Sequence, residues 1–215
     1  MSSINYHKLE LKIAMSADDD RKIVPKILDN EKFILDIGCG IGQTLLALEK
    51  ENNRVLVGSD IDKDAIEFGK KHYGGRIDFV HADAANLPFK DNEFDFIYSR
   101  VSFPYMNIPV VINEIKRVLK KDGRVWLTLH SKERTIDGIL NQIKLSNFIS
   151  AIKMLYVLLN GYLFKYFGIL VPYKNNKYES WQSEKRMKKI LKNSGFNVTI
   201  DKSDRFFIIN ASLSL

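Results

Sequence analysis

The 215-residue sequence contains a single cysteine, Cys39. An intramolecular disulfide and a zinc site built from several cysteines are therefore excluded. The first thirty residues also lack the basic start, apolar core and small-residue cleavage site of a secretory signal. These absences predict a protein of the reducing cytoplasm.

Acidic residues are fewer than basic ones, 26 against 33, which gives a formal net charge of +7. This excess favours anionic partners such as nucleic acid, acidic protein or an anionic membrane surface. The densest basic clusters, residues 70–72 and 185–189, fall inside predicted helices, so we interpret most lysines as solvated helix faces. Nucleic acid is thus disfavoured as a partner without being excluded.

The order of predicted elements indicates an α/β domain. Short apolar runs alternate with amphipathic stretches, as in a parallel sheet with crossover helices. Strands are predicted at residues 33–37, 54–59, 76–81, 94–99 and 124–130, with helices at about 42–52, 62–73 and 107–121. Gly123 is expected to close the last of these helices.

The two ends of the chain add further predicted elements. Residues 1–30 are expected to form an N-terminal helical segment, and Ser183 to cap a helix that stops at Gly195. Two β-rich runs follow across a short polar connection, so they must form an antiparallel hairpin. The length of 215 residues suits a single domain, which we expect as a monomer or a homodimer.

Residues 131–180 are too long for a plain connection, and their centre, 146–171, is overwhelmingly apolar. Polar residues there fall on one narrow helical stripe, so the wide apolar face is expected to be buried. A membrane span is disfavoured because Lys153 and Lys165 would each cost about 2.5 to 3.5 kcal/mol near the bilayer centre. We predict an apolar helical lid packed on the domain, with interfacial membrane contact as the alternative.

The stretch "ILDIGCGIG" at residues 34–42 is the densest glycine cluster. A strand that runs into such a turn and then a helix often binds phosphate. A P-loop is excluded because Gly42 is followed by Gln43 and Thr44, and the G-x-G-x-G spacing departs from the dinucleotide fingerprint G-x-G-x-x-G. Asp36, two residues before the first glycine, is expected to face the same crevice and repel a pyrophosphate.

Two further aspartates end the next strands of the predicted sheet. Asp60 lies some twenty residues past the glycines, where a carboxylate can accept from both ribose hydroxyls. Asp83 follows the third strand and could accept from an adenine amine, with Ala84 donating to a ring nitrogen, although an aspartate in such a place, taken singly, is more often a turn or helix-cap residue. An ammonium, a ribose diol and an adenine amine are the natural partners of the three carboxylates, and S-adenosylmethionine has all three without a phosphate.

These residues resemble class I S-adenosylmethionine-dependent methyltransferases, in particular the small domains of the ubiquinone and menaquinone biosynthesis group. "VGSDID", "HADAANLPF", "FDFIYSR" and "EIKRVLKKDGRVWLTLH" are similar to successive motifs of that family, although Lys121 and Asp122 replace its usual Pro and Gly. The resemblance implies a Rossmann-like seven-stranded sheet of order 3-2-1-4-5-7-6, with strand 7 antiparallel and helices on both faces. It implies S-adenosyl-L-methionine as cofactor, with Ser99 or Arg100 beside the sulfonium. The cofactor-binding residues it implies are Asp36, Gly38, Cys39, Gly40, Gly42, Asp60, Ile61, Asp83, Ala84 and Ser99.

Methyl transfer from a sulfonium depends mainly on alignment of acceptor and methyl, so a general base is optional. His130 and Tyr105 are weak candidates for one, and no metal is implied. "SRVSFPYMN" lacks the Asp or Asn of a D-P-P-Y or N-P-P-Y motif, which disfavours amine methylation of nucleic acid or glutamine. We predict a small or medium-sized apolar acceptor; an RNA or protein methyltransferase and a catalytically silent cofactor-binding subunit remain alternatives.

Overall fold

The computed structural model describes residues 3–16, 18–19, 22–48, 53–173, 177–202 and 206–214. Its helices are α1 (Ser3–Met15), α2 (Gln43–Leu48), α3 (Lys63–Tyr73), the 3₁₀ helix η1 (Phe103–Tyr105), α4 (Ile108–Val118), α5 (Lys132–Lys144), α6 (Phe148–Phe167) and α7 (Glu184–Asn193). Its strands are β1 (Phe33–Ile37), β2 (Val55–Asp60), β3 (Asp78–His81), β4 (Phe94–Ser99), β5 (Leu119–His130), β6 (Phe196–Lys202) and β7 (Phe206–Leu213).

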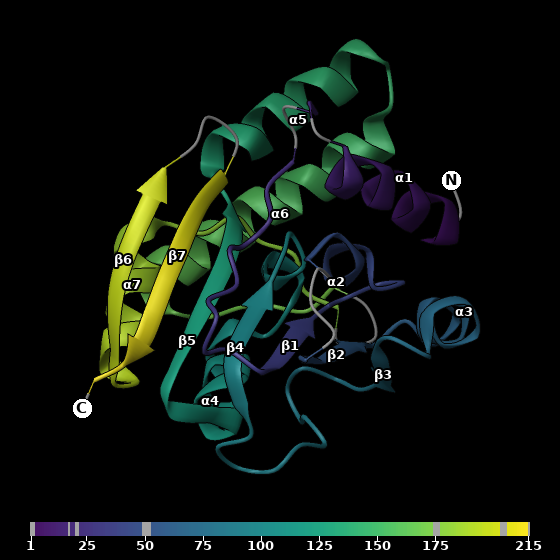
Figure 1. Ribbon diagram of the computed structural model, residues 1–215. Helices are drawn as coiled ribbons and strands as arrows, with labels where there is room; N and C mark the ends of the chain where they lie inside the picture. Colours follow the sequence, from purple (N-terminus) through teal and green to yellow (C-terminus); the bar gives the residue numbers. More distant parts are fainter. Residues whose placement is uncertain are drawn as a thin grey trace.

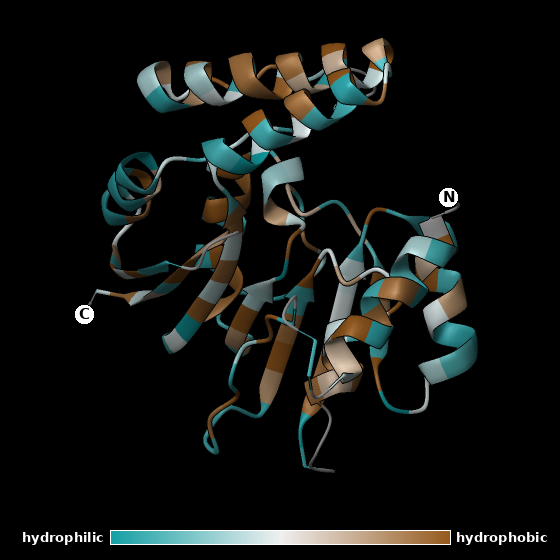
Figure 2. Cartoon of the chain, turned by 90° about the horizontal axis from the view of Figure 1, so that it is seen from above, coloured by the Kyte–Doolittle hydropathy of each residue, from teal (hydrophilic) through white to brown (hydrophobic). Residues whose placement is uncertain are grey.

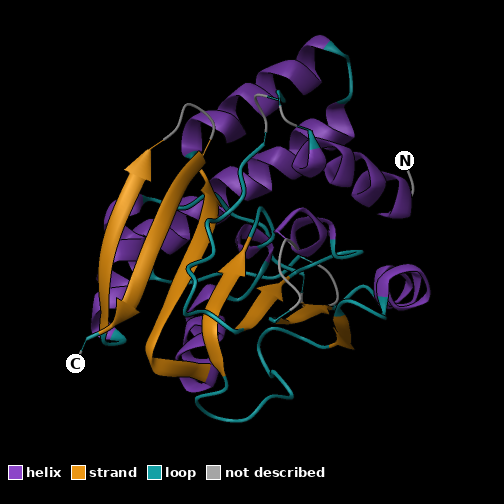
Figure 3. Ribbon diagram, viewed as in Figure 1, coloured by secondary structure: helices purple, strands orange, loops and turns teal. Residues whose placement is uncertain are grey.

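The strands form one seven-stranded sheet of order β3-β2-β1-β4-β5-β7-β6 (Figures 1 and 3). β1 to β5 are parallel, with Leu35 opposite Val57 and Ile97. β7 runs antiparallel between β5 and β6. Both the predicted strand order and the antiparallel seventh strand are confirmed.

Helices cover both faces of the sheet, because alternate residues of each strand point to opposite sides. α4 and α7 pack on one face, where Val111 and Met187 join a core that includes Leu35. α2 and α3 pack on the other face, where Leu45 and Ile66 join Ile34, and Leu11 of α1 packs against the same cluster. The result is a three-layer domain whose parallel strands all end at one edge.

Local differences from the predicted elements have physical reasons. The helix expected to reach residue 121 ends at Val118, and Gly123 lies within β5. A Cβ at Gly123 would lie 3.0 Å from the Asp95 carbonyl oxygen, so this glycine permits close approach to β4 rather than closing a helix. Residues 22–28 are not helical, which agrees with Pro25 in that run, since proline breaks a helix interior.

The capping predictions at the C-terminal end are confirmed. The Ser183 hydroxyl accepts from the Arg186 backbone N–H at the start of α7. Gly195 has φ +88° and follows the helix directly. β6 and β7 then form the expected antiparallel hairpin.

Helices α5 and α6 form the hairpin that fills residues 131–180, and they stand beyond the carboxyl end of β5 at one edge of the molecule (Figures 1 and 2). Within the described residues, α6 is the one helix long and apolar enough to cross a membrane by length and composition, and 22% of that stretch is buried. The expectation that its apolar face is buried is therefore wrong: Ile149 is 84% exposed and Ile152 68%.

Candidate active site

A cavity of about 960 Å³ opens at the carboxyl ends of β1 and β2 and beside the loops that follow β3 and β4. One part, the aspartate half, is lined by Ile37, Gly38, Ser59, Asp60, Ile61, Asp62, Lys63, Asp64, Ala82, Asp83, Ala84 and Ala85. The other part, the tyrosine half, is lined by Ser102, Tyr105, Met106, Asn107, Val110, Lys177 and Tyr178. In a doubly wound sheet this edge is where ligands bind.

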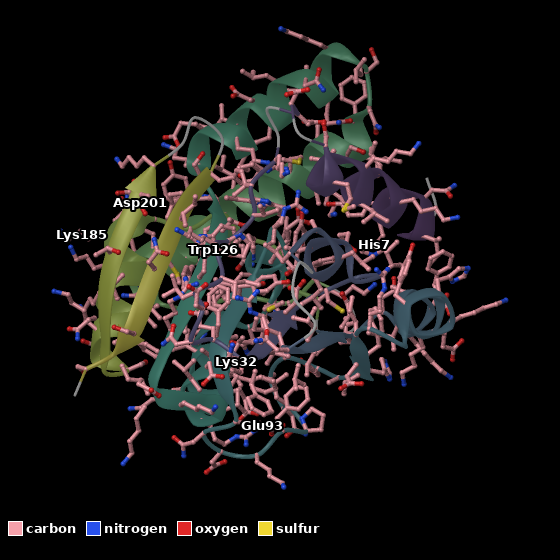
Figure 4. The ribbon with its side chains drawn as sticks, in the orientation of Figure 1. His7, Lys32, Glu93, Trp126, Lys185 and Asp201 are labelled. Carbon is pink, nitrogen blue, oxygen red and sulfur yellow. The ribbon has the colours of Figure 1, made fainter. Side chains whose placement is uncertain are left out.

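The glycine loop supplies backbone where side chains would not fit. Gly38 and Gly40 have φ values of +79° and +56°, which L-residues seldom adopt. A Cβ on Gly38 would lie 2.2 Å from the Ser102 hydroxyl, and one on Gly40 would lie 2.3 Å from His7 of α1. His7 is labelled in Figure 4 beside α2 and α3, and its ring contacts Gln43 at 3.3 Å.

Gly42 has a different role from the other two glycines. Its φ is +87°, but a Cβ there would meet the Phe79 ring at 2.7 Å rather than the cavity. The residue is absent from the cavity lining among the described residues. Gly42 therefore lets the start of α2 pack closely on β3.

Asp60 lies at the boundary of the glycine loop and the cavity. Its Oδ2 accepts from the Gly40 backbone N–H at 2.7 Å, and its Oδ1 accepts from that of Asp62 at 2.9 Å. Each carboxylate oxygen keeps a second lone pair, so the group can still accept from a ligand hydroxyl. Ile61, beside it, is 69% exposed at the cavity wall.

Asp83 and Ala84 line the opposite wall of the aspartate half. The Asp83 Oδ1 accepts from the Ala85 backbone N–H at 2.9 Å, which is the turn role that the sequence left open. Asp83 and Ala84 both line the cavity, and the second carboxylate oxygen of Asp83 has no hydrogen-bond partner among the described residues. The structural and ligand-binding roles of Asp83 are thus compatible.

Asp36 departs from its predicted position. Its side chain is 2% exposed, is absent from the described cavity lining, and its Oδ1 meets no hydrogen-bond partner among the described residues. Burial raises its pKa to about 8, although the Tyr98 hydroxyl opposes the shift. Asp36 is therefore protonated and uncharged at neutral pH. The expectation that its charge repels a pyrophosphate is wrong.

The charged residues of the cavity lining, rather than Asp36, disfavour a pyrophosphate. Asp60, Asp62, Asp64 and Asp83 all line the aspartate half, whereas Lys63 is its one basic residue. Four carboxylates in a confined space disfavour a pyrophosphate and favour a neutral or cationic ligand.

Three other predicted residues lie behind the cavity wall. Cys39 is buried beneath Gly58, and burial raises the pKa of its thiol. Ser99 is fully buried and donates to the Ile37 carbonyl at 2.8 Å. Arg100 turns toward α1, where it pairs with Glu10 at 2.9 Å. None of these side chains lines the described cavity, so any action on a ligand would be indirect.

His130 and Tyr105 are brought together, with ring centroids 5.8 Å apart and the rings edge to face. Tyr105 lines the tyrosine half, and burial raises the pKa of its hydroxyl. His130 lies behind it: it is 7% exposed, and its Nε2 meets no partner among the described residues. Burial, with Arg134 nearby, lowers its pKa to about 3, so the ring is neutral at physiological pH.

Ser102 is the clearest site residue that sequence reasoning missed. Its hydroxyl donates to the Ile37 carbonyl at 2.9 Å, lies 2.7 Å from the Ser99 hydroxyl, and lines the cavity where the two halves meet. The preceding residue, Val101, has φ +65°, a strained conformation for a β-branched side chain. The signal in the sequence is the run Ser99-Arg100-Val101-Ser102 at the end of β4, in which the family resemblance points to the first two residues rather than to Ser102.

The rest of the tyrosine half comes from two distant segments. Met106 and Val110 follow η1, and Tyr178 comes from the segment after α6. The Asn107 amide bridges them by donating to the Tyr178 hydroxyl at 3.4 Å. Of the described residues, none between 146 and 171 lines this cavity.

A second cavity of about 410 Å³ lies between α1, α5 and the end of β4. Arg100, Val101 and Arg134 line it together with Phe206. His130 therefore separates the two cavities, since its ring contacts Tyr105 on one side and Phe206, at 6.0 Å, on the other.

Comparison with known proteins gives a consistent result. The family profile described as "Methyltransferase domain" matches residues 35–127. The chain is 29% identical over 178 residues to a demethylmenaquinone methyltransferase of Staphylococcus haemolyticus, with 76% of this chain and 67% of that enzyme covered. The enzyme of the same name from Staphylococcus aureus is 27% identical over 176 residues, with 75% and 66% covered. The chain thus spans about two thirds of the length of these curated relatives.

Solved structures share the fold. A SAM-dependent methyltransferase from Methanosarcina mazei superposes with a TM-score of 0.63 at 21% identity, covering 87% of this chain and 95% of that one. A SAM-dependent methyltransferase from Aquifex aeolicus gives 0.60 at 15% identity, with 98% of each chain covered.

Proposed function

We propose that this chain is a class I S-adenosylmethionine-dependent methyltransferase, as its similarity to the methyltransferase-domain profile and to the curated relatives supports, and that it methylates a small or medium-sized apolar acceptor held in the tyrosine half of the cavity. The observation that carries the proposal is one continuous cavity whose two halves differ in chemistry. One half carries the four aspartates, and the other combines tyrosines with Met106 and Val110.

The residues present fit S-adenosylmethionine in the aspartate half. Gly38 lines the cavity at a point where a Cβ would collide with Ser102, so its backbone can approach a ligand closely, and the Gly40 backbone N–H holds Asp60 in place. We propose that Asp60 accepts from the ribose hydroxyls, and that Asp83 and the Ala84 backbone bind the adenine edge. The excess of carboxylates over Lys63 suits a cofactor that is cationic and lacks phosphate.

We propose that Ser102, rather than Ser99 or Arg100, lies beside the sulfonium of the cofactor. It lies at the junction of the two halves, next to the close approach at Gly38. When bound there, S-adenosylmethionine would supply a sulfonium-activated methyl group for transfer to the acceptor atom, with the neutral thioether as the leaving group. The chain's contribution is to hold donor and acceptor in register and to exclude water from between them.

The tyrosine half supports an acceptor that reacts without a strong protein base. Its described titratable residues are Tyr105, Tyr178 and Lys177. Because burial raises the pKa of Tyr105, its hydroxyl serves as a hydrogen-bond donor at neutral pH rather than as a base. His130 lies outside the lining and is expected to position Tyr105. The curated relatives, by name, act on demethylmenaquinone, which supports an aromatic or quinone-like acceptor.

Calorimetry and label transfer together test the proposal. S-adenosylmethionine and its demethylated product should bind, and Asp60→Ala should weaken both at least about tenfold, because it removes the ribose acceptor and the partner of the Gly40 amide. Binding of NADH with no binding of either compound would refute the cofactor assignment.

The acceptor is tested with methyl-labelled S-adenosylmethionine and separate lipid, RNA and protein extracts. Label should enter the organic phase, and Val110→Asp should reduce this transfer while leaving affinity for the demethylated cofactor unchanged. Val110 is 39% exposed in the first turn of α4, where an acidic residue is favoured, so the variant should fold. Label confined to RNA or protein would establish one of the alternative acceptors.

A further inference from the structure

Helix α6 carries a row of exposed apolar side chains on the side that faces away from the domain. We define this outer face by Ile149, Ile152, Leu155, Leu159, Tyr166 and Phe167, each at least 48% exposed. The hairpin lies along one edge of the molecule, with hydrophobic segments visible on its helices (Figure 2). Contiguous apolar patches of this kind mark surfaces that contact a partner or a membrane.

The side of α6 that faces the domain carries its buried residues, Val157, Asn160, Gly161 and Phe164, so the exposed apolar row lies on a second side of the helix. Asn160 is 1% exposed: its amide donates to the Glu179 carbonyl at 3.0 Å and its Oδ1 accepts from the Val171 backbone N–H at 2.9 Å. Lys153 pairs with Glu179 at 2.9 Å. Gly161 packs directly on the Trp181 ring. These contacts attach one side of α6 to the domain and leave the apolar side outward.

The charges around the outer face complement an anionic surface. Residues 138–173 contain three lysines, Lys144, Lys153 and Lys165, and no acidic residue or arginine. Lys144 ends α5 and Lys165 lies in the last turn of α6, so cations flank both ends of the apolar row. Pairing this face with a second copy of the chain would bring Lys144 and Lys165 of both copies together, which like-charge repulsion opposes, whereas Lys153 is paired with Glu179.

We infer that the outer face of α6 docks the enzyme on an anionic lipid bilayer, with the helix lying in the plane of the interface. An interfacial helix buries its apolar side among the acyl chains while lysines contact the anionic headgroups. Spanning is opposed by the polar contacts of Asn160 and Lys153, which would have to be broken. This inference uses only the hairpin and does not depend on the identity of the acceptor.

Co-sedimentation of the full chain with vesicles tests the inference. Vesicles of phosphatidylcholine with phosphatidylglycerol should bind the protein more strongly than phosphatidylcholine alone, and added salt should weaken the binding. The triple variant Ile149→Ser, Ile152→Ser, Leu159→Ser should lower partitioning by about 100-fold, because three apolar side chains no longer enter the interface. Lys144→Glu with Lys165→Glu should remove the preference for anionic vesicles.

The matched control is Leu28→Ser with Val55→Ser, two exposed apolar residues that precede β1 and begin β2 at the opposite edge of the sheet. This variant should bind vesicles as the unaltered chain does. Affinity of every variant for demethylated S-adenosylmethionine reports folding and separates this test from that of the proposed function. Failure of the unaltered chain to bind anionic vesicles, or a dimer that the triple variant converts to a monomer, would overturn the inference.

Discussion

The glycine loop between β1 and α2 and the hairpin α5–α6 border the same edge of the sheet but present opposite surfaces. The loop offers the backbone of Gly38 to a cavity whose carboxylates come from the ends of β2 and β3, and its apolar neighbours such as Cys39 and Leu45 are fully buried. The hairpin offers apolar side chains to solvent, and its polar residue Asn160 is buried. In the loop each residue is constrained by close contacts, whereas on the outer face of α6 few contacts constrain the side chains.

This difference indicates that the two regions of the domain have separate roles. The glycine loop and the aspartates that follow β2 and β3 form a fixed site for one cofactor. The hairpin adds no described residue to that site and contributes a surface instead. Substitutions in the two regions should therefore affect binding and stability separately, and four experiments examine how complete that separation is.

The largest effect is expected for Gly38→Ala. The substitution combines a φ of +79° with a Cβ only 2.2 Å from the Ser102 hydroxyl. The loop must shift, so we expect affinity for S-adenosylmethionine to fall by at least about 100-fold, as a displaced backbone loses its fit to the ligand. Gly75→Ala is the control, because a Cβ there has nothing within 4 Å. Equal affinities of the two variants in calorimetry would contradict a close approach of the Gly38 backbone to the ligand.

A second experiment examines the buried carboxyl of Asp36 through its pH dependence. Its pKa is raised to about 8 in the folded chain from an ordinary value of 3.8. The unfolded state therefore loses this proton first, and the folded state loses stability as pH rises toward 8. Asp36→Asn removes that loss and should stabilise the fold at neutral pH by about 2 kcal/mol or more, at roughly 1.4 kcal/mol per unit of pKa difference.

Denaturant titrations between about pH 6.5 and 8 isolate this effect. His130, whose pKa is lowered to about 3, changes stability only below its ordinary value of 6.5 and in the opposite sense, with stability falling as the pH is lowered. Above pH 6.5 its contribution is constant. The unaltered chain should become less stable across the window and Asp36→Asn should not; parallel slopes would mean that Asp36 is ionised in the folded chain.

A third experiment separates the hairpin from the cofactor site. Gly161→Ala places a Cβ 2.2 Å from the Trp181 ring and should displace α6, costing about 1–3 kcal/mol of unfolding free energy. Affinity for S-adenosylmethionine should change less than about twofold if the regions are independent. Gly138→Ala is the control, since its near neighbour is the flexible end of Met154 and alanine favours a helix. A large loss of cofactor affinity in Gly161→Ala would show that the regions are coupled.

The sequence predicted those features that depend on residues close to one another in the chain. Alternating apolar runs were sufficient for the strands of an α/β domain, whereas the strand order was predicted from the family resemblance; Gly38, Asp60 and Asp83 line the cavity at the strand ends, as their spacing implied. The burial of Asp36 could not be predicted, because it depends on packing against residues of other strands, such as Tyr98 of the neighbouring strand β4. The positions of Ser102 and Tyr178 at the cavity could not be predicted either, because these residues meet only when segments distant in the sequence have folded together. For α6 the helix was predicted correctly, but the burial expected of its whole apolar face was wrong, because the domain covers only one side of the helix, with Val157, Asn160 and Phe164, and leaves the rest of the apolar residues exposed.

The smallest effect is expected for Asp83→Asn, which distinguishes the two roles of that residue. Asparagine also supports the turn made by the Oδ1 contact to the Ala85 backbone N–H, so the loop should keep its conformation. The second carboxylate oxygen is replaced by an amide donor, which cannot accept from an adenine amine. We therefore expect affinity for S-adenosylmethionine to fall by about 3- to 10-fold, corresponding to one net hydrogen bond, with no change in thermal stability. Asp83→Ala removes the turn contact as well and should lower both affinity and stability. If instead Asp83→Asn binds like the unaltered chain while Asp83→Ala loses stability, Asp83 acts only on the turn, and the adenine must be held by the Ala84 backbone and the apolar wall.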